Sequence, residues 1–154
     1  MLTCRRTSGQ PPLYALIIGI NNYDGLKQHQ LRGAVPDADA VEDYLKNELK
    51  VPSDHIRSLR DGQASRSEII GAFKGLQHDQ RINEGDPILI YYAGHGTEVA
   101  APEGWETGGR GKIEALVPQD YNNVQGQEVH VIPDRTIGAY LDRIAEKHGD
   151  NIVS

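Results

Sequence analysis

The sequence predicts an α/β fold in which helices cover both faces of a mostly parallel central sheet. Two short runs, residues 13–20 and 87–93, are apolar at nearly every position, which is typical of strands buried on both faces. Amphipathic helical segments separate and follow these runs. Strands that alternate with helices form parallel sheets through right-handed crossovers. The 154 residues suffice for one domain.

The N-terminal part is expected to contain a tail, a buried strand and a helix. Residues 1–12 are polar and end in Pro-Pro, which predicts a disordered tail ahead of a domain at 13–154. The strand at 13–20 ends in the turn-forming residues 21–25. Pro36 then opens a helix, since proline and acidic side chains suit a first turn. Apolar side chains share one face of this helix: Ala38, Val41, Tyr44, Leu45 and Leu49.

The middle of the chain predicts a weak strand and a second helix. Residues 55–59 form the short strand, which Asp61-Gly62 closes. Ser65 and Glu68 have the spacing of a capping box, so the helix is expected to begin beside them. Its apolar face comprises Ile69, Ile70, Phe73 and Leu76.

The C-terminal part begins with the second buried strand, at 87–93. Residues 97–112 are rich in glycine and charge and are expected to form a long loop, followed by a short strand at 113–117. Pro133 and Asp134 start a third helix that ends at Gly149. Residues 151–154 resemble the beginning of a further strand.

Composition excludes several classes of function. Sixteen Lys and Arg against twenty-two Asp and Glu give a formal charge of −6, whereas nucleic-acid binding needs clustered positive charge. No apolar run is long enough to span a membrane, and the N-terminus lacks the apolar core of a secretory signal. The single cysteine cannot form an internal disulfide, which favours a reducing, cytoplasmic setting.

The tripeptide Gly94-His95-Gly96 follows directly on the second buried strand. In parallel sheets, ligands gather at the carboxyl ends of strands, which is where His95 is expected. The small neighbours leave the imidazole accessible, and a histidine acts as a general base or acid near neutral pH. A Gly-His-Gly sequence is also common in plain strand-to-loop turns.

Four motifs resemble those of one peptidase family in order and spacing. YALIIGINNY, LRGAVPDADAVEDYL, ILIYYAGHG and LVPQD are similar to segments of the caspase-like cysteine peptidases, including fungal and plant metacaspases. The resemblance covers residues 13–154. It implies a caspase-like three-layer fold, here incomplete at the C-terminus.

The resemblance also implies roles for three residues. His95 corresponds to the catalytic histidine, and the Gly96 N–H would donate to the oxyanion. Asp37 matches the acid that binds the substrate side chain before the scissile bond, which would favour Arg or Lys. Many metacaspases carry other residues at Ala34 and Pro36, so this pocket is expected to be altered. The alternative for Asp37 is a simple helix-capping role.

The cysteine nucleophile is the main departure from the family. Residues 151–154 would begin the strand that supplies it in relatives, while Cys4, the only thiol, lies in the tail. The resemblance therefore implies an endopeptidase acting on proteins or peptides, and a chain that is inactive alone. A sheet that lacks a central strand is expected to be marginally stable and to self-associate through its open edge.

Two other classes of function compete with the peptidase. The chain would serve as a non-catalytic caspase-like module that dimerises with, or regulates, an intact relative. A flavodoxin-like ligand domain would need an anion-binding loop after Ile20, which the sequence lacks.

No cofactor or metal site is assigned from the sequence. Metacaspases are often calcium-dependent, and acids with suitable oxygens are present, but their spacing defines no site: Glu103, Glu106, Glu114 and Asp120. The remaining histidines are expected to be solvated: His29, His55, His78, His130 and His148.

Overall fold

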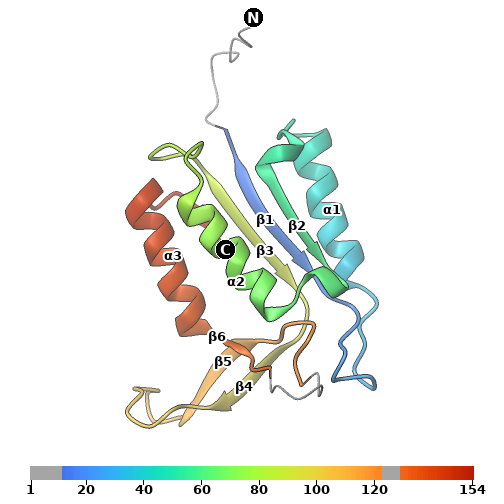
Figure 1. The fold of residues 1–154 in the computed structure, drawn as a ribbon, viewed down its shortest axis with the longest axis vertical. Helices are drawn as coiled ribbons and strands as arrows, with labels where there is room; N and C mark the ends of the chain where they lie inside the picture. Colours follow the sequence, from blue (N-terminus) through green and yellow to red (C-terminus); the bar gives the residue numbers. More distant parts are fainter. Residues whose placement is uncertain (1–11, 123–128) are drawn as a thin grey trace, which may run out of the picture.

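A computed structural model describes residues 12–122 and 129–154. Its central sheet has four parallel strands in the order β2–β1–β3–β7 (Figure 1). They are β1 (Tyr14–Gly19), β2 (Ile56–Arg60), β3 (Ile88–Ala93) and β7 (Ile152–Val153). Because the strands are parallel, their carboxyl ends meet at one edge. The predicted α/β class and parallel sheet are confirmed.

A small antiparallel sheet lies beyond the carboxyl ends of β1 and β3 (Figure 1). It has the order β4–β5–β6, with β4 (Gly96–Ala100), β5 (Lys112–Leu116) and β6 (Ile132–Pro133). The prediction of a loop over 97–112 is wrong in its first part, because β4 pairs with β5 along its whole length. Most β4 side chains are exposed, so the strand lacks the apolar run that reveals a buried one.

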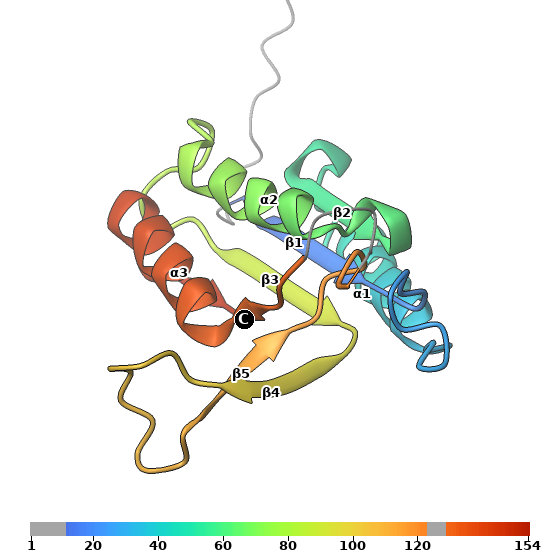
Figure 2. The same cartoon turned by 60° about the horizontal axis from the view of Figure 1, so that its bottom comes forward.

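Three helices cover the central sheet on its two faces. Helix α1 (Ala34–Asn47) packs on one face, whereas α2 (Arg66–His78) and α3 (Asp134–His148) pack on the other (Figure 2). Two short 3-10 turns flank β2, at Ser53–His55 and Asp61–Gln63. The predicted three-layer arrangement is confirmed.

Strand β1 joins the two halves of the core because its side chains alternate between faces. All six of its residues are buried. Ala15 and Ile17 pack in the cluster beneath α1, and Leu16 and Ile18 pack in the larger cluster beneath α2 and α3. A Cβ on Gly19 would lie 2.6 Å from the Cβ of Ala38. The helix therefore rests directly on the carboxyl end of the strand.

The helix starts follow the sequence closely. The Ser65 hydroxyl accepts a hydrogen bond from the Glu68 N–H at 3.2 Å, as the capping-box spacing predicts. The third helix begins at Asp134 and stops before Gly149, whose φ of 88° favours glycine. The first helix begins at Ala34, two residues before the predicted start at Pro36.

The predicted apolar face of α1 is only partly buried. Ala38 and Leu45 are buried, but Tyr44 and Leu49, which the sequence predicts on the same face, are 55% and 49% exposed. Both line an apolar groove of about 440 Å³ that runs to Val153 of β7. We call this surface the β7 groove. It lies on the face that α1 alone covers in the described part of the chain.

Candidate active site

His95 lies two residues beyond the end of β3, at the carboxyl edge of the central sheet. Between them, Gly94 passes very close to two tyrosines. A Cβ at this position would be 2.6 Å from the hydroxyl oxygens of both Tyr23 and Tyr92. Any larger residue would push these side chains away, so the glycine is required by packing.

The two tyrosines hold the backbone of His95 through its N–H and its carbonyl. The His95 N–H donates to the Tyr23 hydroxyl at 2.7 Å. The Tyr92 hydroxyl lies 2.9 Å from the carbonyl oxygen of His95 and 2.9 Å from that of Val117, and donates to this pair. We call Tyr23 and Tyr92 the tyrosine clamp. It fixes the position from which the imidazole projects.

Burial keeps both hydroxyls of the clamp neutral. Desolvation raises the pKa of Tyr23, although its hydrogen bond to the His95 backbone partly offsets this. Desolvation also raises the pKa of Tyr92, and the neighbouring Tyr23 adds to the effect. Both hydroxyls therefore retain their protons throughout the neutral pH range.

The imidazole ring is oriented by a backbone carbonyl. Nε2 of His95 lies 2.5 Å from the carbonyl oxygen of His29, and the Tyr23 ring is tilted 45° against the imidazole at a centroid distance of 4.9 Å. A carbonyl can only accept, so Nε2 carries the proton. In the neutral ring, Nδ1 is then the nitrogen that can take up a proton.

The loop that supplies this carbonyl is itself held by one side chain. Gln30 accepts from the Tyr23 N–H at 2.6 Å and donates to the Tyr23 carbonyl at 3.1 Å. The Leu31 N–H donates to the Asn21 carbonyl at 2.8 Å. These bonds tie the segment around His29 to the end of β1, where the tyrosine clamp begins.

The N–H of Gly96 is directed away from its partner strand. The Val117 N–H donates to the His95 carbonyl at 3.0 Å, which makes His95 and Val117 a hydrogen-bonded pair. Pairs alternate in antiparallel ladders, so the next pair, Gly96 with Leu116, is not hydrogen-bonded. The Gly96 N–H thus points off the outer edge of β4. A main-chain N–H at a free strand edge can donate to an oxygen atom of a ligand.

Asp37 lies in the first turn of α1 with an exposed side chain. The turn is fixed at the same sheet edge as His95, because the Asn21 side chain accepts from the Val35 N–H at 3.1 Å. Gly33 is the N-cap residue, and the structure gives this cap no side-chain hydrogen bond. Asp37 is the acidic residue of this first turn, a position where a carboxylate interacts favourably with the helix dipole, and its side chain is exposed to solvent.

Sequence reasoning missed the groups that position His95. Tyr23 follows two asparagines in a turn, yet it is only 1% exposed. An aromatic residue buried inside turn chemistry is the signal that could have identified it. The His29 carbonyl leaves no such signal, since any residue supplies the same group.

Two predictions about histidines are corrected. His148 is 3% exposed, not solvated, and its Nε2 lies 2.9 Å from the Leu76 carbonyl at the end of α2. His55 is half-buried, and its ring stacks on that of Tyr14 at 4.2 Å. Both side chains pack between secondary-structure elements away from His95.

The acids considered for calcium do not converge. Within 12–122 and 129–154, no group of three or more His, Cys, Asp or Glu side chains is arranged to hold a metal ion. Asp120 instead accepts from the Arg66 N–H at 2.8 Å. Cys4 lies outside the described residues. None of the helices in the described part of the chain has the length and apolar character needed to cross a bilayer.

Comparison with known proteins identifies the class of fold and then the family. A family model described as Caspase domain matches residues 13–136. Metacaspase-1 of Saccharomyces cerevisiae is 35% identical over 113 residues, covering 70% of this chain and 25% of that protein. Metacaspase-6 of Arabidopsis thaliana is 30% identical over 125 residues, covering 78% and 33%.

A solved structure shares the fold. A protein from Geobacter sulfurreducens superposes with a TM-score of 0.65 at 20% identity, covering 92% of this chain and 47% of that one. The fold and the family match thus define a caspase-like α/β domain of the cysteine peptidase class. The chain belongs to the caspase-domain family. It spans about a quarter to a third of the length of these metacaspases.

Proposed function

We propose that this domain performs cysteine-type endopeptidase chemistry with His95 as the general base and acid. The observation that carries the proposal is the bond from Nε2 of His95 to the His29 carbonyl. This bond leaves Nδ1 free for proton transfer, which supports a catalytic role for the ring at the carboxyl edge of the sheet. A base whose second nitrogen is oriented by another group is the arrangement that nucleophilic catalysis requires.

The proposed reaction proceeds through an acyl-enzyme. Nδ1 of His95 removes the proton of a cysteine thiol, and the sulfur forms a bond to the scissile carbonyl carbon. The carbonyl electrons move to the oxygen, where the Gly96 N–H stabilises the charge; one such donor lowers the barrier by about 3–4 kcal/mol. Collapse breaks the C–N bond while His95 returns the proton to the amine, and water then hydrolyses the thioester.

We further propose that Asp37 selects Arg or Lys before the scissile bond. Its carboxylate is exposed at the sheet edge that carries His95, and in the described part of the chain no cation is paired with it. A guanidinium or ammonium group forms a charge-assisted hydrogen bond with such a carboxylate. The substrates are proteins or peptides.

The nucleophile is proposed to come from outside residues 12–154, because these contain no cysteine. The 154-residue chain alone is then expected to turn over no substrate. We assign no catalytic role to Cys4, since no helix N-terminus that would lower its pKa is expected in the polar tail.

Peptide binding tests the site without requiring turnover. Blocked peptides that differ only in arginine or citrulline would be titrated into the isotope-labelled chain while the Gly96 amide is followed by NMR. The arginine peptide is expected to bind about tenfold more tightly, because only it is charged. Asp37→Asn should remove this difference, and Asp43→Asn, on an exposed position of the same helix, should not. Equal binding of the two peptides would refute the specificity assignment.

An activity assay tests the origin of the nucleophile. The purified chain is expected to release no fluorophore from an arginyl peptide substrate, and an electrophilic peptide probe should label Cys4 only. Turnover that disappears in Cys4→Ser would show that the chain carries its own nucleophile and contradict the proposal.

The β7 groove supports a second function, a non-catalytic module that binds itself or an intact relative. Among the described residues, the three most exposed large apolar side chains, Tyr44, Leu49 and Val153, all line this groove. Exposed apolar surface of this kind marks interaction sites. Sedimentation at increasing concentration should reveal self-association that Leu49→Glu weakens. A chain that stays monomeric and binds arginyl peptides would favour the peptidase.

A further inference from the structure

A second groove begins at Gly96 and runs between the β4–β5 hairpin and α3. Its volume is about 600 Å³, and we call it the hairpin groove. Its largest apolar side chains are those of Leu116, Ile137 and Leu141. Figure 2 shows the hairpin beside one end of α3. This position places the groove next to the residue that follows His95.

The rim of the hairpin groove is acidic, and its strands bring two glutamates together. Glu98 and Glu114 are opposite each other in the β4–β5 register. Because pairs alternate along the ladder from the hydrogen-bonded pair at His95, Glu98 and Glu114 form a non-hydrogen-bonded pair. The side chains of such a pair lie closer together, and like charges opposite each other destabilise the sheet. Asp134 at the start of α3 adds a third carboxylate.

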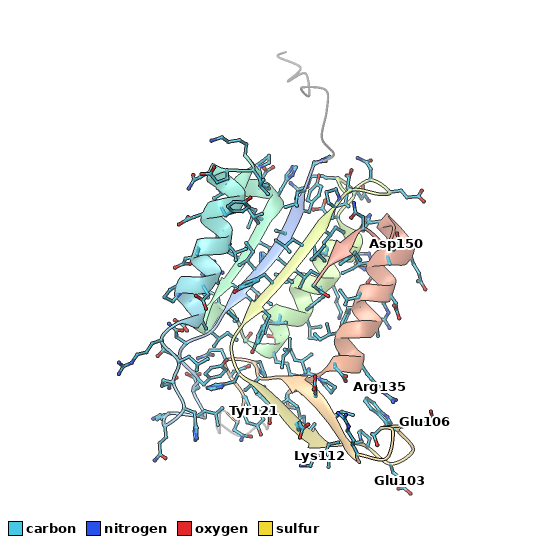
Figure 3. The ribbon with its side chains drawn as sticks, turned by 180° about the vertical axis from the view of Figure 1, so that it is seen from behind. Glu103, Glu106, Lys112, Tyr121, Arg135 and Asp150 are labelled. Atoms are coloured by element: carbon cyan, nitrogen blue, oxygen red, sulfur yellow. The ribbon has the colours of Figure 1, made fainter. Side chains whose placement is uncertain are left out.

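Among the described residues, few positive charges compensate this rim. Lys112 lies 3.9 Å from Glu98, but both side chains are more than half exposed, so water and salt screen the pair. Arg135 is engaged elsewhere: its guanidinium stacks on Trp105 at 4.6 Å and donates to the Glu106 carbonyl. Figure 3 shows Arg135 at the end of α3, facing the loop that carries Glu106. A cationic ligand would relieve the repulsion between the glutamates.

The outer edge of β4 connects the groove to the reacting carbonyl. The Gly96 N–H points off this edge. Because hydrogen-bonded pairs alternate along the β4–β5 ladder, the N–H and carbonyl of Glu98 point off the same edge. An extended peptide can pair with such an edge. Strands advance about 3.3 Å per residue. If the scissile carbonyl of the peptide is held at Gly96, the peptide residues two to three positions away therefore lie over the groove.

We propose that the hairpin groove is a substrate subsite that binds an apolar residue adjacent to a basic one, two to three positions from the scissile bond. The apolar side chain contacts Leu116, Ile137 and Leu141, and the cation lies between Glu98 and Glu114. This subsite is separate from the one assigned to Asp37. It rests on the proposed function, because it presumes that the scissile carbonyl lies at Gly96.

Gly138 offers a way to block the groove without disturbing the fold. It lines the groove on α3, and a Cβ there would meet no heavy atom within 4 Å. Gly138→Leu should fill the groove and, as a replacement for a helical glycine, should not lower stability. Gly71→Leu is the matched control, since Gly71 has the same open surroundings on α2.

The test is a titration of the chain with a blocked peptide that contains adjacent leucine and lysine, observed through the methyl signals of Ile137 and Leu141. We expect these signals to shift. Replacing the lysine by glutamate, or the leucine by serine, should weaken binding at least about tenfold. Gly138→Leu should abolish the shifts, and Gly71→Leu should preserve them.

The charge contribution is tested with a double variant. Glu98→Gln with Glu114→Gln should weaken binding of the leucine–lysine peptide about tenfold and reduce its salt dependence. Glu84→Gln with Glu146→Gln, at exposed positions away from the groove, should have no effect. Unchanged binding in Gly138→Leu or in the Glu98/Glu114 variant would overturn the subsite.

Failure of the subsite and failure of the proposed function give different results. The proposed function is judged by whether Asp37→Asn removes the difference in affinity between the arginine and citrulline peptides. This measurement does not involve the groove. A peptide with arginine two residues from the leucine–lysine pair should bind at least about tenfold more tightly than peptides with either feature alone. Equal affinities would overturn the placement of the groove beside the scissile bond, even if arginine binding at Asp37 is intact.

Discussion

The two sides of the proposed active site are held in place by different kinds of interaction. On one side, neutral hydroxyls of Tyr23 and Tyr92 hold His95 from within the core. On the other side, α1 carries Asp37 and is tied to β2 by charges, since Arg60 contacts Glu42 at 2.8 Å and Asp39 at 2.9 Å. The proposed catalytic histidine therefore has a rigid, pH-insensitive support. Asp37, the proposed specificity residue, lies on a helix whose attachment depends on ionised side chains.

The difference indicates where this domain tolerates change. Buried hydrogen bonds are costly to break, because the remaining partner stays unsatisfied. The Arg60–Asp39 pair contributes less, because the Asp39 side chain is 57% exposed and water screens the charges. Substitutions near His95 should therefore affect stability and geometry together, whereas a substitution at Asp37 should affect recognition alone.

The largest effect is expected from Gly94→Ala. The new Cβ would lie 2.6 Å from both clamp hydroxyls, and overpacking of this kind costs about 1–3 kcal/mol. Loss of the bonds to His95 places the expected decrease in the free energy of unfolding near the top of that range. Urea denaturation measures it. Gly62→Ala, at an open position, is the control, and an equal effect of both variants would contradict the packing argument.

Removing one hydroxyl of the clamp should have an intermediate effect. Tyr23→Phe leaves the His95 N–H without its acceptor. Tyr92→Phe removes the donor to the Val117 carbonyl, whereas the His95 carbonyl keeps its bond from the Val117 N–H. Each should lower the free energy of unfolding by about 1–2 kcal/mol and shift the His95 ring signals in NMR spectra. Tyr91→Phe, on the opposite face of β3, should do neither. Unshifted His95 signals in both clamp variants would show that the tyrosines do not position the ring.

The contributions of the two sides to the free energy of unfolding should also depend differently on pH. Burial opposes ionisation of Glu42, but hydrogen bonds from Lys46 and Ser58 and the charges of Lys46 and Arg60 outweigh it, so the pKa of Glu42 is lowered. Its contribution is present above the ordinary value of 4.5 and is lost as pH falls through the lowered pKa. The pKa values of Tyr23 and Tyr92 are raised, so their contribution persists at acid pH and is lost only above the ordinary tyrosine value of 10.0.

Glu42→Gln measures the acid side of this prediction. The variant should be about 1 kcal/mol less stable at neutral pH, the usual scale for a hydrogen bond, and the difference from the parent should shrink as pH falls below 4.5. Denaturation curves at several pH values provide the comparison. A difference that stays constant down to pH values well below this would mean that Glu42 is not ionised in its contacts with Arg60.

The smallest effect on stability is expected from Asp37→Asn. The side chain is exposed in the first turn of α1, so the free energy of unfolding should change by less than about 0.5 kcal/mol. Binding of arginyl peptides should nevertheless fall. A large loss of stability, measured by the same denaturation curves, would reveal a structural role.

Sequence reasoning recovered the parts of the fold that depend on burial. The apolar run at 13–20 became β1 with all six residues buried, and the Ser65 cap fixed the start of α2. It missed β4, because an exposed edge strand carries no apolar pattern. It also predicted one apolar face for α1, which the described residues cover only in part, so that Tyr44 and Leu49 stay exposed.

For the site, the sequence located His95 but not its supports. A strand followed by Gly-His-Gly places the imidazole at the sheet edge through local geometry. The Tyr23 hydroxyl, by contrast, reaches His95 across 72 positions of the chain, and the His29 carbonyl across 66. Contacts of this range depend on the assembled topology, and a backbone carbonyl carries no identity in the sequence.

The tautomer of His95 tests the central claim most directly. Long-range nitrogen–proton NMR spectra of the labelled chain distinguish the two ring nitrogens, with His95→Gln identifying the signals. If the His29 carbonyl orients the ring for catalysis, the neutral imidazole is protonated on Nε2 and Nδ1 is the unprotonated nitrogen. A neutral ring protonated on Nδ1, or an even mixture of tautomers, would contradict the assignment of His95 as the oriented base.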